Sequence, residues 1–396
     1  MSGADESVDP VTLEVLRNAC VAVAEEMNAT LVRTSYSPNI KDRRDCSCAL
    51  FDVVGEGADA TAEMISQAEN IPVHLGAMPY SVAAAIEAFP PGELEDGDAI
   101  LLNDPFHGGA HLPDMTLVTP VFVGGELVAV AANRAHHADV GGGRAGSVAA
   151  DSTEIYQEGL RVPPVKLYDG GDPVEDVFDL LLTNVRTPDE RRGDFRAQRA
   201  ANRTAVERVR ELATRHGLDT LRAATTEIKA YAERRMRAEI EALPDGTVSF
   251  EDRLDDDGQG TGDIRIAVAV TVDDDELVVD FEGTSEQVPG AINAPLAVTA
   301  SATYYAVRCV TDPDVPPNAG TYRPVEIRAP EGTVVNAQPP AAVVGGNLEI
   351  SQRATDALAL CLGVDGDVLQ VAEVAPVVRT HLGDGVADDR PLPDRD

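Results

Sequence analysis

The chain has 396 residues, of which 43% are hydrophobic, so it is not a disordered protein and has enough apolar material for two or three domains. Its 68 acidic residues outnumber 32 lysines and arginines, and the formal net charge of −36 disfavours partners such as nucleic acid or an anionic membrane. Only three of the cations are lysines, and scattered acid with so little lysine predicts a protein adapted to high salt.

The first ten residues, MSGADESVDP, have neither the basic region nor the apolar stretch of a signal peptide. No run approaches 18 uninterrupted apolar residues, so we expect a cytoplasmic protein. The five cysteines are scattered. Cys46 and Cys48 are too close for an ordinary disulfide, and no CxxC pair suggests zinc or redox chemistry.

The N-terminal region, residues 1–95, is expected to consist of helix and loop. Asp9 can cap a helix that has Pro10 in its first turn, and apolar residues then recur at spacings of three and four as far as residue 34. The polar segment SPNIKDRRDCSCALFD follows, and the end of the segment at residues 63–89 is again helical in pattern.

A β-rich region is expected at residues 96–174. The segments MTLVTPVFV and ELVAVAAN are typical strands, and they flank a Gly-Gly pair at 124–125 that indicates a hairpin. Residues 175–244 are mostly helical in pattern, with a break at His216 and Gly217.

An α+β region is expected at residues 245–362. It begins with three strands that have acidic turns at 255–257 and 273–275, and continues with helix at about 296–310, strand at 321–336 and helix at about 347–362. Residues 363–396 form an atypical tail. The order of elements predicts an α+β fold in which mixed β-rich regions flank a central helical block.

Histidines are concentrated in one part of the chain. Five of the seven fall within 64 residues, and the segment NDPFHGGAHLPD at 103–114 alone holds two histidines and two aspartates. Imidazole is the commonest neutral metal ligand, so the clustering favours a site. The five are His74, His107, His111, His136 and His137.

The hairpin predicts which of these residues meet. If the Gly-Gly pair at 124–125 is its centre, residues whose numbers sum to 249 face each other, so that Asp114 lies opposite Ala135 and His136 opposite Pro113. The open end of the hairpin then brings Asp114 beside His136 and the next residue, His137.

Two imidazoles and a carboxylate that converge in this way can hold Zn²⁺, Mn²⁺ or Fe²⁺ and leave positions for water and substrate. His111 lies one short turn upstream of Asp114. Side-chain alternation does not decide between His136 and His137, because a change of one residue in the turn reverses it. The alternative is that these side chains cap strand ends and bond backbone groups in a buried loop.

Two other polar segments are weaker candidates for a binding site. The segment RRD at 43–45 either binds an anionic group or closes a turn through an Arg–Asp pair. The segment GGGRAGS at 141–147 can form an anion-binding nest. Neither that segment nor DGQGTGD at 257–263 has the lysine and spacing of a P-loop. The sequence contains no nucleotide-binding signature, so any ATP chemistry must be supplied by another chain.

Eight motifs in order carry a family resemblance. They are SPNIKDRRDCSCALFD, IPVHLGAMP, NDPFHGGAHLPD, AHHADVGG, DSTEIYQEGLRVPPVKL, NVRTPDERRGDFRAQRAAN, VDFEGTSEQVPGAIN and GGNLEISQR. Together they resemble the hydantoinase B / 5-oxoprolinase family, which comprises the B-type subunits of N-methylhydantoinases and the related α subunits of acetone-type carboxylases. The resemblance covers roughly residues 9–362.

The resemblance implies a hetero-oligomer in which an A-type partner with an ATPase fold uses ATP to phosphorylate a carbonyl or lactam oxygen. The B-type subunit then hydrolyses the ring amide of a small cyclic amide or, in the carboxylases, completes a carboxylation. The carboxylase α subunits hold a divalent metal by an HxxD pair and a later histidine. These positions correspond to His111, Asp114 and His136, the same trio that the hairpin argument brings together.

Further roles are implied for neighbouring residues. His137 or Asp139 would orient a ligand or move protons, as catalytic residues, while His107 is a bystander. His74, Arg44 and Glu158 match family motifs and would contact substrate, unless they serve the structure.

The end of the chain departs from the family pattern. Members continue with Gly- and Asn-rich segments after the helix that begins at GGN, whereas the text after residue 362 matches none of them, as a frameshifted or truncated end would. Three functions therefore compete: a subunit of a hydantoin- or 5-oxoproline-opening hydrolase, the α subunit of a ketone carboxylase, and an inactive scaffold that still binds its A-type partner.

Overall fold

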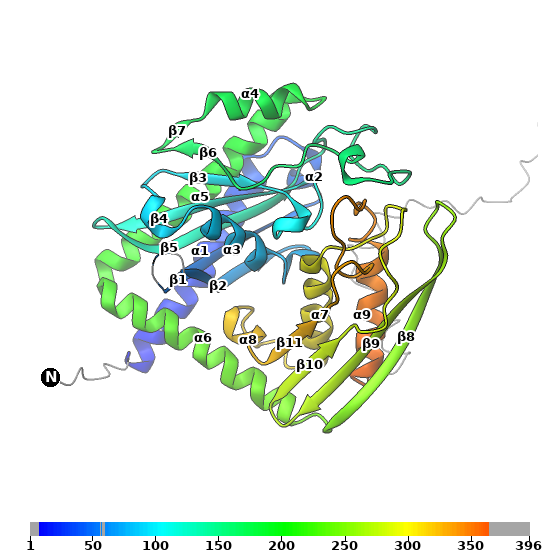
Figure 1. Cartoon of the computed structure of the whole chain (residues 1–396). Coiled ribbons are helices and arrows are strands. Elements are labelled where there is room, and N and C mark those ends of the chain that lie inside the picture. Colours follow the sequence, from blue (N-terminus) through cyan, green and yellow to red (C-terminus); the bar gives the residue numbers. More distant parts are fainter. Residues whose placement is uncertain (1–7, 56, 58–59, 364–396) are drawn as a thin grey trace, which may run out of the picture.

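The computed structural model describes residues 8–55, 57 and 60–363. Within these residues the chain forms two β-sheets with helices packed on them, which confirms the α+β class (Figure 1). An atypical tail was predicted at residues 363–396. Residues 364–396 of this tail lie outside the described residues. Among the helices that the structure describes, none is long and apolar enough to cross a membrane.

The larger sheet has seven strands in the order β2-β1-β5-β4-β3-β6-β7, and all neighbouring strands are antiparallel. Two of these strands lie in the region 1–95, which was expected to contain helix and loop only, and β1 is an interior strand paired with both β2 and β5. The strands are β1 Cys46–Val54, β2 Thr61–Glu69, β3 Ala99–Leu102, β4 Asp114–Val123, β5 Glu126–His136, β6 Val165–Asp169 and β7 Asp172–Pro173.

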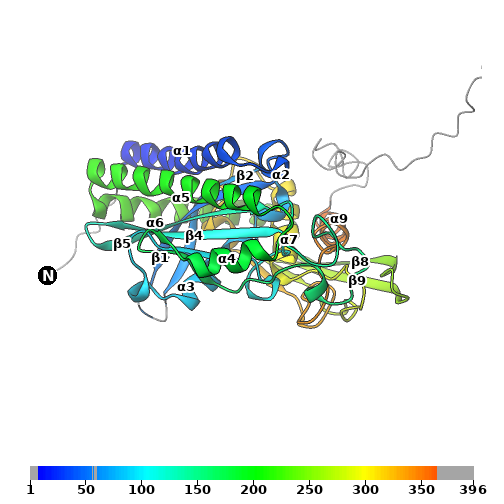
Figure 2. The same cartoon turned by 90° about the horizontal axis from the view of Figure 1, so that it is seen from above.

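Helices cover both faces of this sheet (Figure 2). The helices α1, Pro10–Thr34, and α5, Pro188–His216, lie on one face, and α3, Met78–Ala88, lies on the other. The Asp9 carboxylate caps α1 by accepting the backbone N–H groups of Val11 and Thr12, as the sequence predicted. Two shorter helices, α2 Pro38–Lys41 and α4 Glu175–Thr183, precede β1 and α5 respectively.

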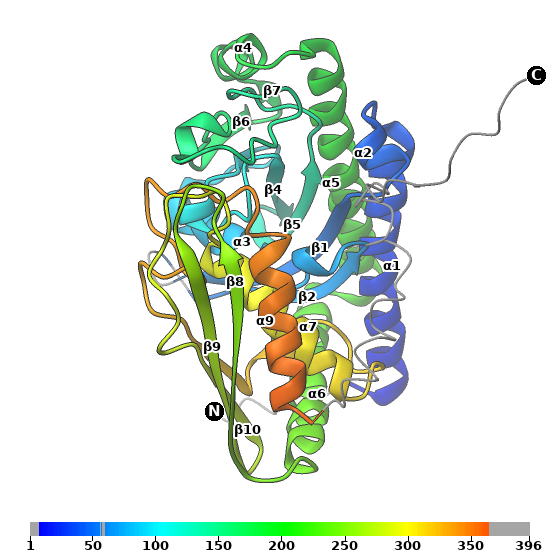
Figure 3. The ribbon, with the colours of Figure 1, turned by 90° about the vertical axis from the view of Figure 1, so that its right-hand side faces the viewer.

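The second sheet has four strands in the order β11-β10-β9-β8. Its apolar face packs on two helices, α7 Leu296–Val310 and α9 Glu349–Cys361 (Figure 3). The long helix α6, Leu218–Glu241, joins the two cores, since Leu221 packs in the first and Ile240 in the second. The strands are β8 Gly246–Asp256, β9 Gly262–Asp273, β10 Glu276–Asp280 and β11 Val325–Arg328.

The strand expected at 321–336 is much shorter than predicted. Val325–Arg328 forms a strand after the short helix α8, Ala319–Tyr322, and beyond it Thr333 makes only isolated bridges, to Glu286 and Asn336. Pro324 and Pro330 bracket this strand, and a proline has no N–H group with which to continue a ladder. The predicted helical block, by contrast, is confirmed with its break at Gly217, where φ is 86°.

The β4–β5 hairpin has the predicted turn but a different register at its open end. Gly124 and Gly125 both have positive φ, and next to them the paired residue numbers sum to 249. A β-bulge then places one extra residue, Val128, in β5, so that the sum is 250 along the rest of the ladder. The prediction that Asp114 faces Ala135 was therefore wrong by one residue, because Asp114 pairs directly with His136.

Candidate metal centre

Three neighbouring strands of the larger sheet, β1, β4 and β5, have their termini at the same end of the sheet and bring polar residues together there. Asp114 begins β4 directly opposite His136, the last residue of β5. On the other side of β5, the backbone N–H of His136 donates to the carbonyl of Asp45, which immediately precedes β1, at 3.0 Å. The antiparallel order thus gathers residues that are up to 91 positions apart, from Asp45 to His136.

His111 joins this group through the turn before β4. The N–H of Asp114 donates to the His111 carbonyl at 3.0 Å, and the turn directs the His111 ring back so that Nδ1 lies 3.0 Å from Oδ2 of Asp114. The rings of His111 and His136 are 5.0 Å apart between centroids. One possible ligand atom from each of His111, Asp114 and His136 lies within 4.8 Å of the others, which agrees with the predicted trio.

The Asp114 carboxylate is fully buried, yet neither of its oxygens makes a well-directed hydrogen bond within the described part of the chain. Burial by itself would raise its pKa, but His111 and His74 outweigh burial and hold the pKa well below its usual range. A buried carboxylate held between two imidazoles is costly unless a cation compensates its charge. The residues present therefore fit a divalent metal ion.

The two imidazoles of the trio differ in their electrostatics. Burial disfavours the charged form of both rings. It lowers the pKa of His136, whereas at His111 the nearby Asp114 carboxylate outweighs burial and raises the pKa. His136 is thus a neutral ring suited to metal binding, and its Nδ1 lies 3.1 Å from Nδ2 of Asn39 in α2, which leaves Nε2 for the cluster.

His74, predicted to contact substrate, lies in this cluster. It ends the short 3₁₀ helix η2, Pro72–His74, and is 1% exposed. Its Nδ1 is 3.0 Å from the Ser47 hydroxyl, and its Nε2 lies 3.6 Å from Oδ1 of Asp114 and 3.9 Å from Oδ1 of Asp45. Asp45, His74 and Asp114 form a second group whose possible ligand atoms lie within 4.8 Å of one another.

His137 points away from the cluster. Asp114 and His136 are a cross-strand pair on the α3 face of the sheet, so the next residue, His137, points toward α5. There its Nε2 is 3.0 Å from Oε1 of Gln198, and its ring packs on Phe195 with centroids 4.7 Å apart. Burial lowers the pKa of His137 to about 4.

Asp139, the other predicted catalytic residue, has a carboxylate that accepts four hydrogen bonds from nearby groups. Its carboxylate accepts the N–H groups of Gly141 and Gly146 and both the backbone N–H and the guanidinium of Arg186. Burial opposes its charge, but these donors outweigh it and lower the pKa. The contacts fasten the 141–147 loop, so they do not bring Asp139 to the cluster.

The remaining predicted residues lie around the site. Arg44 is exposed, with a φ of 55°, one residue before Asp45 in sequence. Glu158 is buried and accepts the backbone N–H groups of Val343 and Val344 at 2.8 and 3.0 Å. His107, expected to be a bystander, has a side chain 64% exposed that bonds Asp104.

Three residues of the site were missed from the sequence: Asn39, Asp45 and Asn347. Asn347, just before α9, contacts Nδ1 of His111 across 236 positions of sequence. Each lies in a motif that carried the resemblance, so the motifs were the available signal. No periodicity or spacing singles out these residues, because their contacts are long-range.

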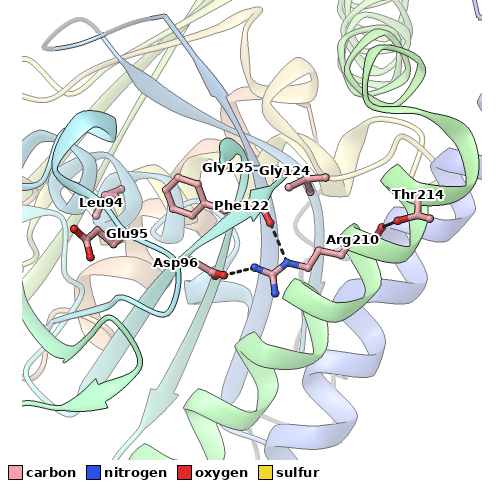
Figure 4. Close-up of a pocket in the computed structure, with 9 residues that line it drawn as sticks. Leu94, Glu95, Asp96, Phe122, Gly124, Gly125, Arg210 and Thr214 are labelled. Carbon is pink, nitrogen blue, oxygen red and sulfur yellow. Dashed lines mark hydrogen bonds and ion pairs between the residues drawn. The ribbon is translucent and has the colours of Figure 1, made fainter.

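A surface groove of about 580 Å³ lies at the other end of the hairpin (Figure 4). It is lined by the turn at Gly124 and Gly125 and by Arg210 of α5, whose guanidinium bonds the Phe122 carbonyl and Asp96. The ten residues of β4 separate this groove from Asp114 by roughly 30 Å. The groove therefore has no part in the candidate metal centre.

The model of the family described as Hydantoinase B/oxoprolinase matches residues 9–384. The chain belongs to this family. Among its relatives, the caprolactamase subunit beta of Pseudomonas jessenii is 38% identical over 357 residues, which are 90% of this chain and 60% of the relative. The 5-oxoprolinase 1 of Arabidopsis thaliana is 37% identical over 380 residues, 89% of this chain and 29% of the relative. The chain thus spans 60% or less of these two relatives.

Two solved structures have the same fold as this chain. The crystal structure of ATP-dependent caprolactamase from Pseudomonas jessenii superposes with a TM-score of 0.83 at 38% identity, over 90% of this chain and 60% of the solved chain. The nucleotide-free structure of acetone carboxylase superposes with a TM-score of 0.80 at 20% identity, over 89% of this chain and 48% of that one. The second likeness concerns the fold alone.

Proposed function

We propose that this chain is the B-type subunit of an ATP-dependent cyclic-amide hydrolase that opens hydantoin or 5-oxoproline rings. An A-type ATPase subunit would activate the ring carbonyl, and this chain would complete the hydrolysis. The relatives named 5-oxoprolinase and caprolactamase support a hydrolase of this class. A separate ATPase is supported by the lack of a nucleotide-binding signature in the sequence and by the ATP-dependence stated for the caprolactamase structure.

The observation that carries the proposal is the buried Asp114 carboxylate, which lies between the imidazoles of His111 and His74. His111, Asp114 and His136 would hold Mn²⁺, Zn²⁺ or Fe²⁺. A divalent ion bound there would polarise the activated carbonyl or lower the pKa of a water molecule. In this arrangement Asp114 supplies the negative charge, and His136 is available as a neutral ligand.

The other residues orient these groups and hold the substrate. Asn39 and Asn347 contact the His136 and His111 rings and would fix their orientation. The exposed Arg44, beside Asp45, would bind an anionic group of the activated substrate, with His74 and Glu158 deeper in the site. For His137 and Asp139 we propose positioning roles, because their contacts fasten the strand end and the following loop.

The two competing functions make different predictions. Ketone carboxylation would require bicarbonate, and the carboxylase likeness, at 20% identity, extends to the fold alone. An inactive scaffold would co-purify with an A-type chain but hold no metal at the site. A hydrolase subunit would hold metal and would release ring-opened product only when the A-type chain and ATP are present.

The test is reconstitution with an A-type chain, ATP and a hydantoin or 5-oxoproline, followed by chromatography of the ring-opened product. Asp114→Asn should lose both bound metal and ATP-dependent product, whereas His107→Asn, a change in the same segment, should retain both. Full ring opening by a metal-free Asp114→Asn complex would contradict the proposal. Product that appears only with bicarbonate and a ketone would favour the carboxylase.

A further inference from the structure

One side of α5 carries a line of arginines on a protein that is otherwise strongly acidic. These arginines recur at spacings of four, three and four residues, so they follow one face of the helix over roughly 16 Å. The members of this arginine stripe are Arg192, Arg196, Arg199 and Arg203. The guanidinium of Arg192 lies over the Phe178 ring of α4, and that of Arg199 lies over the Tyr168 ring of β6. The stripe is therefore on the side of α5 that faces α4 and β6.

The stripe lacks close carboxylate partners, although the chain has 68 acidic residues. Most other arginines among the described residues have a carboxylate oxygen within 3.4 Å. Within the stripe the shortest such distance is 3.9 Å, from Arg192 to Glu175 and from Arg203 to Glu207. Arg196 is exposed and makes no ion pair or hydrogen bond with any residue that the structure describes. The stripe thus keeps positive charge that its own surroundings do not neutralise.

The helix beside the stripe carries the opposite charge. The helix α4 lies at the edge of the molecule beside α5 (Figures 1 and 3), and the rings of Phe178 and Phe195, 6.0 Å apart between centroids, join the two helices. Three acidic residues of α4 are exposed, and we call them its acidic face: Glu175, Asp176 and Asp179. Two of them, Asp176 and Asp179, have no ion pair within the described ranges. A basic and an acidic area therefore lie side by side without close pairing.

Large exposed side chains flank both areas. Leu180 of α4 is 59% exposed, and Tyr36 is 67% exposed. The Tyr36 ring lies directly on α5, because a Cβ at Gly193, one residue after Arg192, would overlap it. Tyrosine and arginine are enriched in protein–protein interfaces and carry much of their binding energy. The surface thus has the composition of an interface as well as its charge pattern.

We infer that this surface joins two copies of the chain, the arginine stripe of one copy contacting the acidic face of α4 of the other. A two-fold interface must be self-complementary, because both copies offer the same patch. Adjacent basic and acidic areas meet that requirement, since each stripe then lies against the partner's α4.

The net charge of the chain favours the same occupant. At −36, two copies repel each other in most relative orientations, and the stripe is a region where that repulsion is reversed. The contact is also separate from the candidate metal centre. Asp114 and His136 lie on the α3 face of the larger sheet, whereas α5 covers the opposite face. The inference therefore does not depend on the proposed function.

The inference is tested by sedimentation velocity of the full chain, at the lowest salt concentration at which far-UV circular dichroism shows the folded protein, because salt screens exposed charges. We expect a species of twice the mass of one chain. A stripe variant, Arg196→Glu with Arg203→Glu, and an α4 variant, Asp176→Arg with Asp179→Arg, should each place like charges opposite each other. Each should weaken self-association on the order of 100-fold.

A matched control changes the charge by the same amount elsewhere. Arg253→Glu with Arg328→Glu alters two exposed arginines of the second sheet and should leave the dimer intact. If circular dichroism shows that a double variant is unfolded, the single change Leu180→Arg decides. It places a cation against the partner's stripe and should give a monomer.

Mixing the stripe variant with the α4 variant is the sharpest test. In the mixed pair, the new glutamates of one chain face the new arginines of the other, and the two unchanged areas face each other as in the wild type. The mixture should therefore dimerise although each variant alone is monomeric.

Three outcomes would overturn the inference: a wild-type chain that is monomeric at tens of micromolar, a dimer that both variants retain, or a mixture that stays monomeric. A wild-type monomer whose stripe variant loses only binding to an A-type chain would assign the surface to that partner and would also overturn the inference.

Discussion

Glu158 makes the stability of the protein depend on pH in a way that one substitution can isolate. The side chain is 1% exposed, its Oε1 accepts the N–H groups of Val343 and Val344, and its Oε2 is buried with no partner among the described residues. Burial outweighs these two hydrogen bonds and the nearby His111, and it raises the pKa of Glu158 from 4.5 to about 7. The folded protein therefore favours the neutral carboxyl.

The size and sign of the effect follow from linkage. Between pH 4.5 and about 7 the folded state binds this proton and the unfolded state does not. The contribution to the free energy of unfolding is fully present below pH 4.5 and is lost as the pH rises through about 7, with a total of about 3 kcal/mol. Glu158→Gln keeps an acceptor oxygen for both N–H groups and is uncharged at every pH.

The variant should accordingly gain stability relative to the wild type as the pH rises. We expect nearly equal urea midpoints at pH 5 and an advantage for Glu158→Gln of about 2–3 kcal/mol at pH 8. The chain has no tryptophan, so far-UV circular dichroism is the signal, and a chelator keeps metal binding out of the comparison. The exposed Glu87→Gln is the control. A Glu158→Gln advantage that is absent or does not grow with pH would refute the reasoning.

Three further predictions concern stability and use the same unfolding measurement. A Cβ at Gly346 would lie 2.1 Å from the Asn293 carbonyl oxygen, so Gly346→Ala should cost about 2 kcal/mol, whereas Gly143→Ala, with its nearest atom at 3.5 Å, should change little. Lys229 is 2% exposed and pairs with two carboxylates, so Lys229→Ala should cost about 3 kcal/mol and the exposed Lys41→Ala almost nothing; equal losses would contradict this. Because the net charge is −36, the unfolding midpoint should rise with salt, and identical midpoints at low and high salt would argue against adaptation to salt.

The helices and hairpins could be predicted because their signals are local. The spacing of apolar residues located α1, and the glycine at 217 located the break between α5 and α6. The strand β1 was missed because its first six residues are all buried. A strand covered on both faces has no polar–apolar alternation, and here it follows a polar segment typical of a loop.

The cluster itself was only partly visible in the sequence. His111 and Asp114 are three residues apart, and the hairpin leads from them to His136, so simple counting brings these residues together. Asp45 arrives through the pairing of β1 with β5, and Asn347 comes from the loop before α9. Both contacts depend on how distant segments pack, and packing of that kind leaves no trace in local spacing.

The choice between His136 and His137 depends on a single residue of β5. If the pairing seen at the tip of the hairpin continued without the bulge, Asp114 would face Ala135. His137 would then lie on the same side of the sheet as Asp114. The bulge at Val128 adds one residue, which reverses the alternation and turns His136 toward Asp114 and His137 toward α5. Since valines and alanines surround the bulge, nothing in the local composition marks it. The proposed metal ligand, His136, is therefore selected by the pairing of β5 with both β4 and β1, and the candidate site depends on the whole larger sheet.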